Sequence, residues 1–391
     1  MVKELSVRFY GLQVGVLRLV NGKMEFTYDE GVQNQISLSL PLQKEPFKEK
    51  ACRAFFGGLL PENTNMRELL AKKYNINVND DFKLLKEIGR DCAGALSFHE
   101  MEEPQKHYQM IKIEGSILSE EELKKYLEEL PYRPYLGKRL SLAGAQEKTA
   151  VCVIDDKIAL PDDDVPTTHI IKTALPKYSQ SIQNEYICMK AAREMGLDVA
   201  EVEIRKVEEI YFLLVKRFDR KYSNNLECER ILQEDFAQSL GVQSRDKYKV
   251  TFKDCLKVLN QTAAPANSKL KFVKQVIFNY LIGNTDAHAK NFSVYLTQGG
   301  ISLTPAYDLL CSSIYDCDQR IAMKLGKAKY YAEVEAKDWE IFAQDLDISY
   351  KLVQTELERQ KQLLPGIVEN IVKELDCEVG FRILDYIASL V

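Results

Sequence analysis

Alternation of apolar and polar residues dominates the start of the chain. Between Leu5 and about Leu42 apolar residues recur at every second position, as in strands with one buried face. Asn21-Gly22, a dipeptide favoured in two-residue hairpins, separates two of these runs. The pattern predicts a small antiparallel sheet.

Helical spacing of apolar residues follows, at residues 51–60, 66–74 and 82–88. Gly89 can cap the last of these helices. Together with the sheet, they predict a first subdomain over residues 1–100. Residues 101–137 are charged and interrupted by prolines, with a short helix that stops before Pro131, and are predicted to be a connector.

Two further segments are expected after the connector. Strand patterns with one helix near residues 184–195 predict a small lobe at 138–220. Helical spacing then prevails, which predicts a mostly helical large lobe at 221–391. In its tail, Pro365-Gly366 is expected to separate two helices.

The composition limits the possible functions. The chain has 391 residues, 46% of them hydrophobic, which is enough for more than one core. A net charge of −5 argues against a broad DNA-binding surface. The nine cysteines include no Cys-x-x-Cys pair, and neither a signal peptide nor a membrane-spanning run is found. We therefore expect reduced thiols and a cytoplasmic location.

Residues 283–291 read Gly-Asn-Thr-Asp-Ala-His-Ala-Lys-Asn and carry the candidate chemistry. Asp286 should lie on a loop just after an apolar helix, and Asp308 follows beyond a predicted hairpin. In a phosphotransferase, Asp286 would orient or deprotonate the acceptor hydroxyl, and His288 would brace the loop. Asn291 and Asp308 would hold magnesium against ATP. Each Asp or Asn taken alone would more commonly cap a turn, but their joint spacing predicts a kinase.

Two upstream segments could contact phosphates. Residues 141–148 combine small side chains with a final Lys148, although they form neither a Gly-x-Gly-x-x-Gly nor a Walker sequence, so an ordinary turn is the alternative. Lys172 ends an apolar strand, and Glu185 in the next helix could pair with it. The alternative is a solvated lysine and a glutamate that only complements the helix dipole.

The strand at residues 211–215 leads into Lys216-Arg217-Phe218-Asp219, where the chain should cross into the helical lobe. Backbone groups at such a crossing can bind adenine, and Asp219 could accept hydrogen bonds from the ribose. The alternative is a charged strand end that only terminates pairing.

These motifs resemble the HipA-like serine/threonine kinases, toxins of bacterial toxin–antitoxin modules. The resemblance covers nearly the whole chain. It includes the segments at residues 55–61, 89–95, 143–149, 216–220, 233–235, 284–292 and 307–308. The Gln233-Glu234-Asp235 match is specific, but spacing and charge assign no role to each residue. Lys216 departs from the family, which often has glutamate there.

The resemblance implies an α+β, bilobed protein-kinase-like fold that uses ATP and Mg²⁺. Asp286 would be the catalytic base, and Asn291 and Asp308 the metal ligands. Ser141 matches an autophosphorylated position, where a phosphate would expel its loop from the nucleotide pocket. The implied nucleotide contacts are Ala143, Gly144, Ala145, Gln146, Glu147, Lys148, Lys172, Lys216, Arg217, Phe218, His288, Ala289, Lys290 and Asn291, with Tyr307 beside Asp308.

Partners also follow from the resemblance. It implies a protein substrate, most plausibly an aminoacyl-tRNA synthetase such as glutamyl-tRNA synthetase, whose inactivation would arrest growth. A helix-turn-helix antitoxin of HipB type would supply DNA contacts, so DNA binding would be indirect and no membrane is involved. Two other functions stay open: a small-molecule or lipid kinase, and a non-catalytic corepressor that binds the antitoxin and keeps a vestigial ATP pocket.

Overall fold

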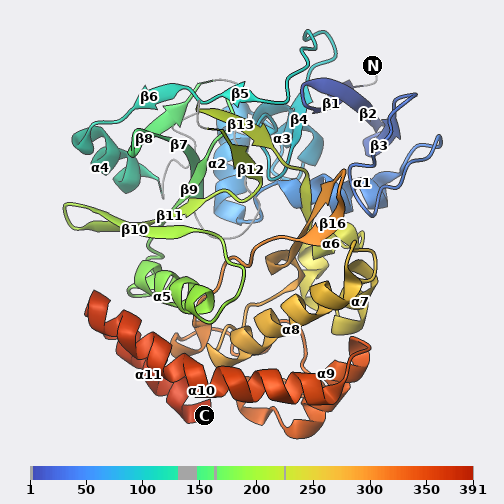
Figure 1. Ribbon diagram of the computed structural model, residues 1–391. Coiled ribbons are helices and arrows are strands. Elements are labelled where there is room, and N and C mark those ends of the chain that lie inside the picture. The colour runs from blue at the N-terminus through green and yellow to red at the C-terminus, as the bar shows by residue number, and fades with distance from the viewer. Residues whose placement is uncertain (1–2, 131–147, 163–164, 224–225, 391) are drawn as a thin grey trace. The chain divides into compact units, whose positions relative to one another are not determined.

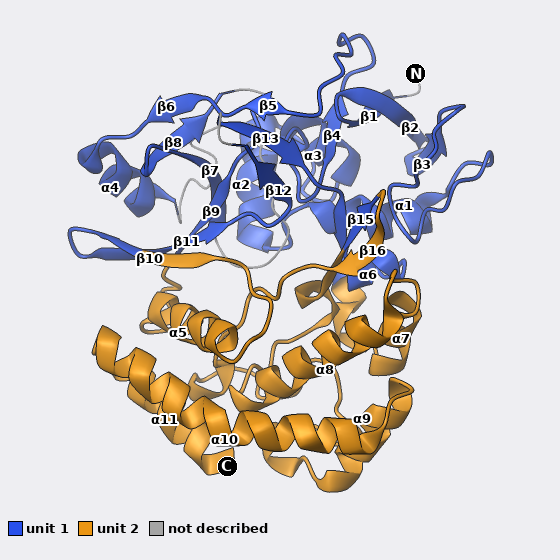
Figure 2. Ribbon diagram, viewed as in Figure 1, with its two compact units in different colours: residues 1–173, 205–244, 295–297 blue, residues 174–204, 245–294, 298–391 orange. Residues whose placement is uncertain are grey.

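The computed structural model describes residues 3–130, 148–162, 165–223 and 226–390 (Figure 1). The chain forms two compact units, coloured separately in Figure 2. Unit 1 contains residues 1–173, 205–244 and 295–297, and unit 2 contains residues 174–204, 245–294 and 298–391. The chain thus enters each unit more than once, and these units cut across the four predicted segments.

The first sheet of unit 1 is antiparallel, with the order β3-β2-β1-β4. Its strands are β1 (Lys3–Phe9), β2 (Leu12–Val20), β3 (Lys23–Tyr28) and β4 (Leu96–His99). Asn21 and Gly22 have φ values of +51° and +76°, which suits a type I′ turn. The sheet and hairpin predicted from the alternating pattern are confirmed.

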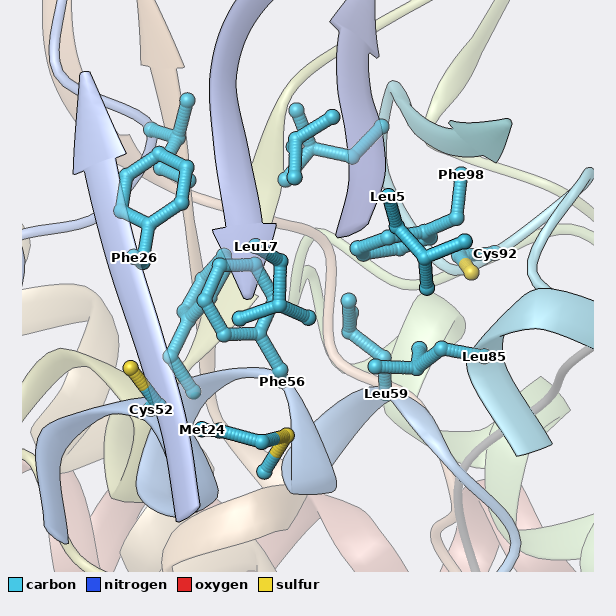
Figure 3. Packing of buried hydrophobic residues seen from close by; sticks show 14 of the residues in the cluster. Leu5, Leu17, Met24, Phe26, Cys52, Phe56, Leu59, Leu85, Cys92 and Phe98 are labelled. Atoms are coloured by element: carbon cyan, nitrogen blue, oxygen red, sulfur yellow. The ribbon is translucent and has the colours of Figure 1, made fainter. Parts of the chain in front are cut away.

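Three helices cover this sheet near their predicted positions: α1 (Glu49–Phe55), α2 (Thr64–Tyr74) and α3 (Asp81–Ile88). A short 3₁₀ turn, η1 (Gly57–Leu59), follows α1. The core between sheet and helices combines aliphatic and aromatic side chains (Figure 3). Phe56 packs edge-on against Phe26 and Phe98, with ring centroids 5.3 and 5.8 Å apart. Such contacts add to the stabilisation from burying these rings.

A second antiparallel sheet of unit 1 has β11, β9, β7, β8 and β6 as successive neighbours. These strands are β11 (Ile210–Lys216), β9 (His169–Thr173), β7 (Lys148–Ile154), β8 (Lys157–Pro161) and β6 (Gly115–Ile117). Helix α4 (Glu120–Glu129) buries Leu123, Tyr126 and Leu127 against Val151 and Ile171 of this sheet. Residues 111–130 are therefore part of unit 1 and not the connector that their charge predicted.

A smaller sheet, ordered β12-β13-β5, completes unit 1. It consists of β12 (Arg220–Tyr222), β13 (Glu227–Arg230) and β5 (Ile111–Lys112). The chain then continues through β14 (Gln233–Asp235) and the short helix α6 (Phe236–Ser239). Strands β10 (Val202–Val207) and β15 (Ser293–Thr297) each begin in unit 2 and end in unit 1.

Unit 2 is mostly helical, as predicted for the end of the chain. Its helices are α5 (Ser181–Glu194), α7 (Phe252–Leu259), α8 (Pro265–Leu281), α9 (Ala336–Asp345), α10 (Tyr350–Leu375) and α11 (Glu378–Leu390), and it also contains β16 (Gly300–Leu303). Among the described helices, none has the length and apolar character needed to cross a membrane.

The predicted break at Pro365-Gly366 is wrong. Helix α10 runs through Pro365 and ends only at Asp376, which adopts the left-handed conformation with φ +44°. Leu364 and Val368 are buried on either side of the proline. Proline removes one backbone hydrogen bond from the helix. The helix stays continuous because the face that contains Leu364 and Val368 remains packed.

Buried ion pairs connect segments of unit 1 that lie far apart in the sequence. Asp91, 2% exposed, accepts hydrogen bonds from Arg217 at 3.1 Å and from Arg220 at 2.6 Å. The Asp219 carboxylate accepts a hydrogen bond from Arg217 at 2.7 Å and forms an ion pair with Arg220 at 3.0 Å. Burial would raise the pKa of Asp91, but the guanidinium groups of Arg220 and Arg217 outweigh burial and hold its pKa well below the usual range. The network therefore stays ionised.

Replacing Asp91 by alanine should destabilise the protein strongly, because it leaves Arg217 and Arg220 buried beside one carboxylate. We expect Asp91→Ala to lose about 3–5 kcal/mol in urea unfolding followed by circular dichroism. The control is Asp156→Ala, which removes an ion pair to Arg205 from a carboxylate that is 86% exposed. This change should cost under about 1 kcal/mol. Equal losses in the two variants would contradict the role given to the buried network.

Candidate active site

Helix α8 fixes the start of the predicted catalytic loop. It begins with Pro265, whose missing N–H costs nothing in the first turn, and it buries Phe272 and Ile277. After the helix, Gly283 has φ +71°, and a Cβ atom there would lie 2.5 Å from the ring of Tyr386. Only glycine fits this turn without displacing the tyrosine. The chain therefore leaves the helix along a defined path.

The loop exposes one side chain and buries the rest. Asp286 is exposed, whereas every other residue from Leu281 to Lys290 is buried. The backbone around it is fixed, since the Thr285 N–H donates to Ser312 Oγ at 2.7 Å and the Ala322 N–H donates to the Thr285 carbonyl at 2.9 Å. A fixed loop thus directs a single carboxylate outward.

The structure brings together the two predicted metal ligands, Asn291 and Asp308. Asn291 ends the 3₁₀ turn η3 (Ala289–Asn291), and its Nδ2 donates to Asp308 Oδ2 at 2.9 Å. Its Oδ1 accepts from the His288 N–H at 3.1 Å, and that N–H also bonds the Asp286 carbonyl at 2.8 Å. The His288 N–H therefore links the backbone of Asp286 to the Asn291 side chain, whereas the bracing role predicted for the histidine stays a prediction.

Asp308 has an unusual backbone. Its φ is +60°, a conformation in which Asp and Asn are enriched among residues with a side chain. Asn284 Nδ2 donates to the Asp308 carbonyl at 3.4 Å and to Asn279 Oδ1 at 2.8 Å. Three residues later, the Asn184 side chain of α5 bonds both backbone groups of Cys311, at 2.9 and 2.8 Å. Unusual backbone held by such contacts is typical of functional sites.

Tyr307 and Lys290, both predicted nucleotide contacts, are joined to each other in unit 2. The Tyr307 hydroxyl lies 2.6 Å from Ser293 Oγ and donates to the Lys290 carbonyl at 2.7 Å. Lys290 itself is 8% exposed. These bonds fix the segment before Asp308 against the end of the catalytic loop, whereas contact with a nucleotide stays a prediction.

Lys148 and Lys172 lie directly opposite each other on the neighbouring strands β7 and β9. Side chains at such positions emerge on the same face of the sheet, where two like charges disfavour each other. Their register therefore places two positive charges on one face of the sheet, and contact with a phosphate stays a prediction. Glu185, the predicted partner of Lys172, lies in α5 of unit 2, and this pairing stays a prediction.

The crossing after β11 is held by backbone and aromatic contacts. The Arg217 N–H donates to the Thr168 carbonyl at 3.0 Å, and the Phe218 carbonyl accepts from the Tyr295 hydroxyl at 2.8 Å. Lys216 places its Nζ 5.6 Å from the centre of the Tyr222 ring. The backbone here is thus well defined, and adenine binding stays a prediction.

Asp219 has a structural environment that differs from the predicted ribose contact. Its side chain is 7% exposed, and its Oδ2 also accepts from the Gly94 N–H at 2.6 Å. Arg217 and Arg220 hold its pKa below the usual range despite burial. Because both oxygens are engaged within unit 1, we assign Asp219 to the buried ion-pair network. Sequence spacing alone gave no sign that Asp91 and Asp219 would share the same arginine partners.

Six other predicted site residues lie outside the described residues. They are Ser141, Ala143, Gly144, Ala145, Gln146 and Glu147. Their roles therefore stay predictions.

The Gln233-Glu234-Asp235 motif now has structural roles for its acidic residues. Glu234 is 0% exposed, and its Oε1 accepts from the Leu38 N–H at 2.9 Å and from Ser239 Oγ at 3.0 Å. Burial raises the pKa of Glu234 to about 7. Asp235 caps helix α6 by accepting from the Gln238 N–H at 2.8 Å. The motif therefore joins the residue 37–38 loop to α6.

One residue at the site was not predicted. The Tyr248 hydroxyl donates to Asp286 Oδ1 at 2.9 Å, and its ring packs edge-on against His288 with centroids 5.3 Å apart. Tyr248 lies 38 positions before Asp286, in the 3₁₀ helix η2 (Ser244–Lys249). Its sequence surroundings of charged residues carry no signal for a position at a catalytic loop.

Comparisons with known proteins show which family the chain belongs to. A family model of the HipA-like C-terminal domain matches residues 140–376, and one of the HipA N-terminal domain matches residues 5–99. The chain belongs to the HipA-like kinase family. The protein-kinase-like α+β fold implied by the sequence motifs is confirmed.

Individual relatives extend over most of this HipA-like chain. A protein named putative kinase Y4mE from Sinorhizobium fredii is 38% identical, over 96% of this chain and 92% of its own. The serine/threonine-protein kinase toxin HipA of Shewanella oneidensis is 29% identical over 81% of this chain and 76% of its own. HipA in a solved complex of Shewanella oneidensis HipA, HipB and operator DNA superposes with a TM-score of 0.86 at 25% identity, covering 99% of this chain and 95% of that one.

Glu234 should make the stability of the folded protein depend on pH. Its pKa of about 7, against an ordinary value of 4.5, means that the folded state binds the proton more tightly than the unfolded state does. Its contribution is therefore fully present below pH 4.5 and is lost as the pH rises to about 7. Relative to Glu234→Gln, which cannot ionise, the wild type should lose about 3 kcal/mol of unfolding free energy across this window.

Urea unfolding at closely spaced pH values measures this difference. The control is Glu114→Gln, whose side chain is 52% exposed beside Lys112 and which should follow the wild-type curve. If the wild type and Glu234→Gln keep a constant difference from pH 4.5 to 7.5, Glu234 does not titrate as its burial implies.

Proposed function

We propose that this protein is a serine/threonine protein kinase that transfers the γ-phosphoryl group of ATP, with Mg²⁺, to a protein. The observation that carries the proposal is the arrangement of unit 2, where a fixed loop exposes Asp286 and links it through His288 to the contacting pair of Asn291 and Asp308. Such a set of groups suits phosphoryl transfer, in which catalysis rests on positioning and charge stabilisation.

The Asn291–Asp308 pair fits a magnesium ion. Magnesium prefers oxygen ligands at about 2.0–2.1 Å in octahedral geometry, so neighbouring ligand atoms lie about 2.9 Å apart. The contact in this structure is a hydrogen bond, with Asn291 Nδ2 2.9 Å from Asp308 Oδ2, and Asp308 is partly exposed. To bind the ion, Asn291 would present Oδ1 to it in place of Nδ2 and would give up the bond that Oδ1 accepts from the His288 N–H. When bound, the ion would neutralise charge on the phosphates of ATP.

Asp286 would act on the acceptor. An exposed carboxylate can accept a hydrogen bond from a serine or threonine hydroxyl and take its proton as the oxygen bonds to the γ-phosphorus. The bond from that phosphorus to the β–γ bridging oxygen breaks, and ADP leaves. The backbone around Thr285 and His288 is already fixed, so little conformational entropy would be lost in positioning Asp286 for the reaction.

The nucleotide contacts of unit 1 complete the proposal. Lys148 and Lys172, opposite each other on β7 and β9, supply the positive charge that phosphates need. Lys216 to Phe218 would meet adenine through backbone groups, so the lysine that replaces the glutamate common in the family should not prevent binding. Residues 143–147, His288 to Asn291 and Tyr307 are the other nucleotide contacts that the resemblance implies.

In the cell, we propose that the kinase acts as a growth-arresting toxin. Its support is the family and the relative named as a serine/threonine-protein kinase toxin. An aminoacyl-tRNA synthetase, glutamyl-tRNA synthetase first, is the proposed substrate, and autophosphorylation at Ser141 the proposed off-switch. The solved complex of HipA with HipB and DNA supports a helix-turn-helix antitoxin that carries the DNA contacts.

Two substitutions test the assigned roles. Asp286→Asn removes the base and Asp308→Asn removes a negatively charged metal ligand, while both keep the size of the side chain. We expect each to lower transfer of label from γ-labelled ATP to protein by about 10²-fold or more. Phosphoproteomics after induction of the wild type and of Asp286→Asn would identify the acceptor.

Asp347→Asn is a matched control for Asp308→Asn. Asp347 has φ +51° in unit 2, close to the +60° of Asp308, and its side chain is 86% exposed. Its replacement should leave transfer unchanged. Wild-type rates in Asp286→Asn or Asp308→Asn would refute the role of that residue, and ATP binding by a wild type that transfers no phosphate would favour a corepressor.

A further inference from the structure

Two pairs of hydrogen bonds flank Asp308, and both connect its segment to the region of helix α5. Before the aspartate, the Ala306 N–H donates to the Asp198 carbonyl at 2.7 Å, and the Ala306 carbonyl accepts from the Ala200 N–H at 2.9 Å. Both partners follow α5 in the chain, and all four residues belong to unit 2. The backbone is therefore fixed two residues before Asp308.

After the aspartate, one side chain makes both bonds. Asn184 of α5, which is 0% exposed, donates from Nδ2 to the Cys311 carbonyl at 2.9 Å, and its Oδ1 accepts from the Cys311 N–H at 2.8 Å. The Cys188 thiol, one turn further along α5, donates to the same Oδ1 at 3.5 Å. Burial raises the pKa of Cys188, so this group stays a thiol that can donate. The Asn184 amide is thus held in the orientation that both Cys311 groups need.

We propose that Asn184 is a positioning residue for Asp308, the metal ligand of the proposed kinase. Asp308 has φ +60°, and a residue with a side chain keeps such a conformation where the surrounding contacts impose it. With the chain held two residues before and three residues after Asp308, the backbone between these points has little freedom to relax. This inference rests on the proposed function and names the side chain that keeps one of its metal ligands in place.

Loss of the Asn184 bonds would act on the metal and not on the nucleotide. Without them Cys311 can move, and Asp308 can relax towards an ordinary φ that turns its carboxylate from Asn291, which it now contacts at 2.9 Å. Groups that bond a metal ligand directly typically contribute about 10- to 100-fold to metal affinity. Asn184 acts through the backbone three residues away, so we expect a smaller effect.

A role in stability alone would give a different result. A buried asparagine can serve only to satisfy backbone groups of a segment outside helices and strands, as Cys311 is. Its loss would then lower the melting temperature and leave the metal affinity of the folded protein unchanged. The bonds at Ala306 favour positioning, because the contacts at both ends enclose Asp308, the one residue of the fully described stretch 306–311 that has a positive φ.

Substitution of Asn184 in the full-length chain tests the proposal. Asn184→Leu keeps about the same volume and removes both bonds, and Asn184→Ala removes the bonds and the volume. The probe is Mn²⁺, which takes the same oxygen ligands as Mg²⁺, with saturating ADP, and free Mn²⁺ is measured by electron paramagnetic resonance. We expect the Kd for Mn²⁺ to rise about 5- to 20-fold in both variants. The Kd for ADP in EDTA should stay within about twofold of the wild type.

The dependence of activity on Mg²⁺ provides a second measurement. The Mg²⁺ concentration for half-maximal transfer of label from γ-labelled ATP to protein should rise by the same factor as the Kd for Mn²⁺. The rate at saturating Mg²⁺ should stay within about threefold of the wild type, because the ligand is misplaced and not removed. A fall in rate with an unchanged Mg²⁺ dependence would contradict the proposal.

Gln360→Leu is the matched control for the loss of a buried amide. Gln360 of α10 is 0% exposed and donates from Nε2 to the Lys274 carbonyl of α8 at 3.0 Å and to Glu356 Oε1 at 2.8 Å. Its replacement should lower the melting temperature, and the Kd for Mn²⁺ should stay at the wild-type value. An equal loss of Mn²⁺ affinity in Gln360→Leu would mean that general destabilisation explains the effect, and it would overturn the positioning role.

The other outcomes are also decisive. An unchanged Kd for Mn²⁺ in either folded Asn184 variant overturns the proposal, and failure of both variants to fold assigns Asn184 to stability and overturns it too. Asp308→Asn separates this inference from the proposed function. If Asp308→Asn binds Mn²⁺ as the wild type does, the metal role of Asp308 fails, whereas loss of binding in Asp308→Asn beside normal binding in the Asn184 variants rejects only the role of Asn184.

Discussion

Backbone hydrogen bonds around residues 283–291 are the constraint on which the site depends. Thr285 bonds Ser312 and Ala322, while the His288 N–H lies between the Asp286 carbonyl and the Asn291 side chain. Within residues 281–290, Asp286 is exposed and every other residue is buried. The backbone of the loop is therefore fixed by contacts within unit 2. In the proposed kinase, a backbone held in this way would need little further ordering during the reaction.

Charged residues serve opposite purposes in the two units. In unit 1, Asp91 and Asp219 are buried and neutralised by arginines, which makes them contributors to stability and withdraws them from chemistry. In unit 2, Asp286 is exposed and Asp308 partly so. Burial, and not residue type, therefore separates the aspartates of the ion-pair network from the two that are proposed to take part in the reaction.

Local patterns predicted much of the fold and of the site, whereas long-range contacts escaped them. The Asn21-Gly22 hairpin and the helices of both units follow from short-range spacing, and Asp286 and Asn291 are neighbours on one loop. Residues 111–130 looked like a linker because their surface is charged, although Leu123 and its neighbours are buried. The contact of Asp91 with Arg217 spans 126 positions, and no local pattern encodes it. Tertiary packing likewise overrode the expected break at Pro365.

Tyr248 shows where motif reasoning ends. A sequence motif describes residues that are close together along the chain. It therefore identifies Asp286, His288 and Asn291, but it cannot identify a contacting residue from another segment. The Tyr248 hydroxyl, from 38 positions away, donates to Asp286 Oδ1, and the Tyr248 ring lies near Lys247 and His288. Spacing within the motif therefore predicts the neighbours of Asp286 on its own loop, whereas a contact from another segment follows only from the tertiary fold.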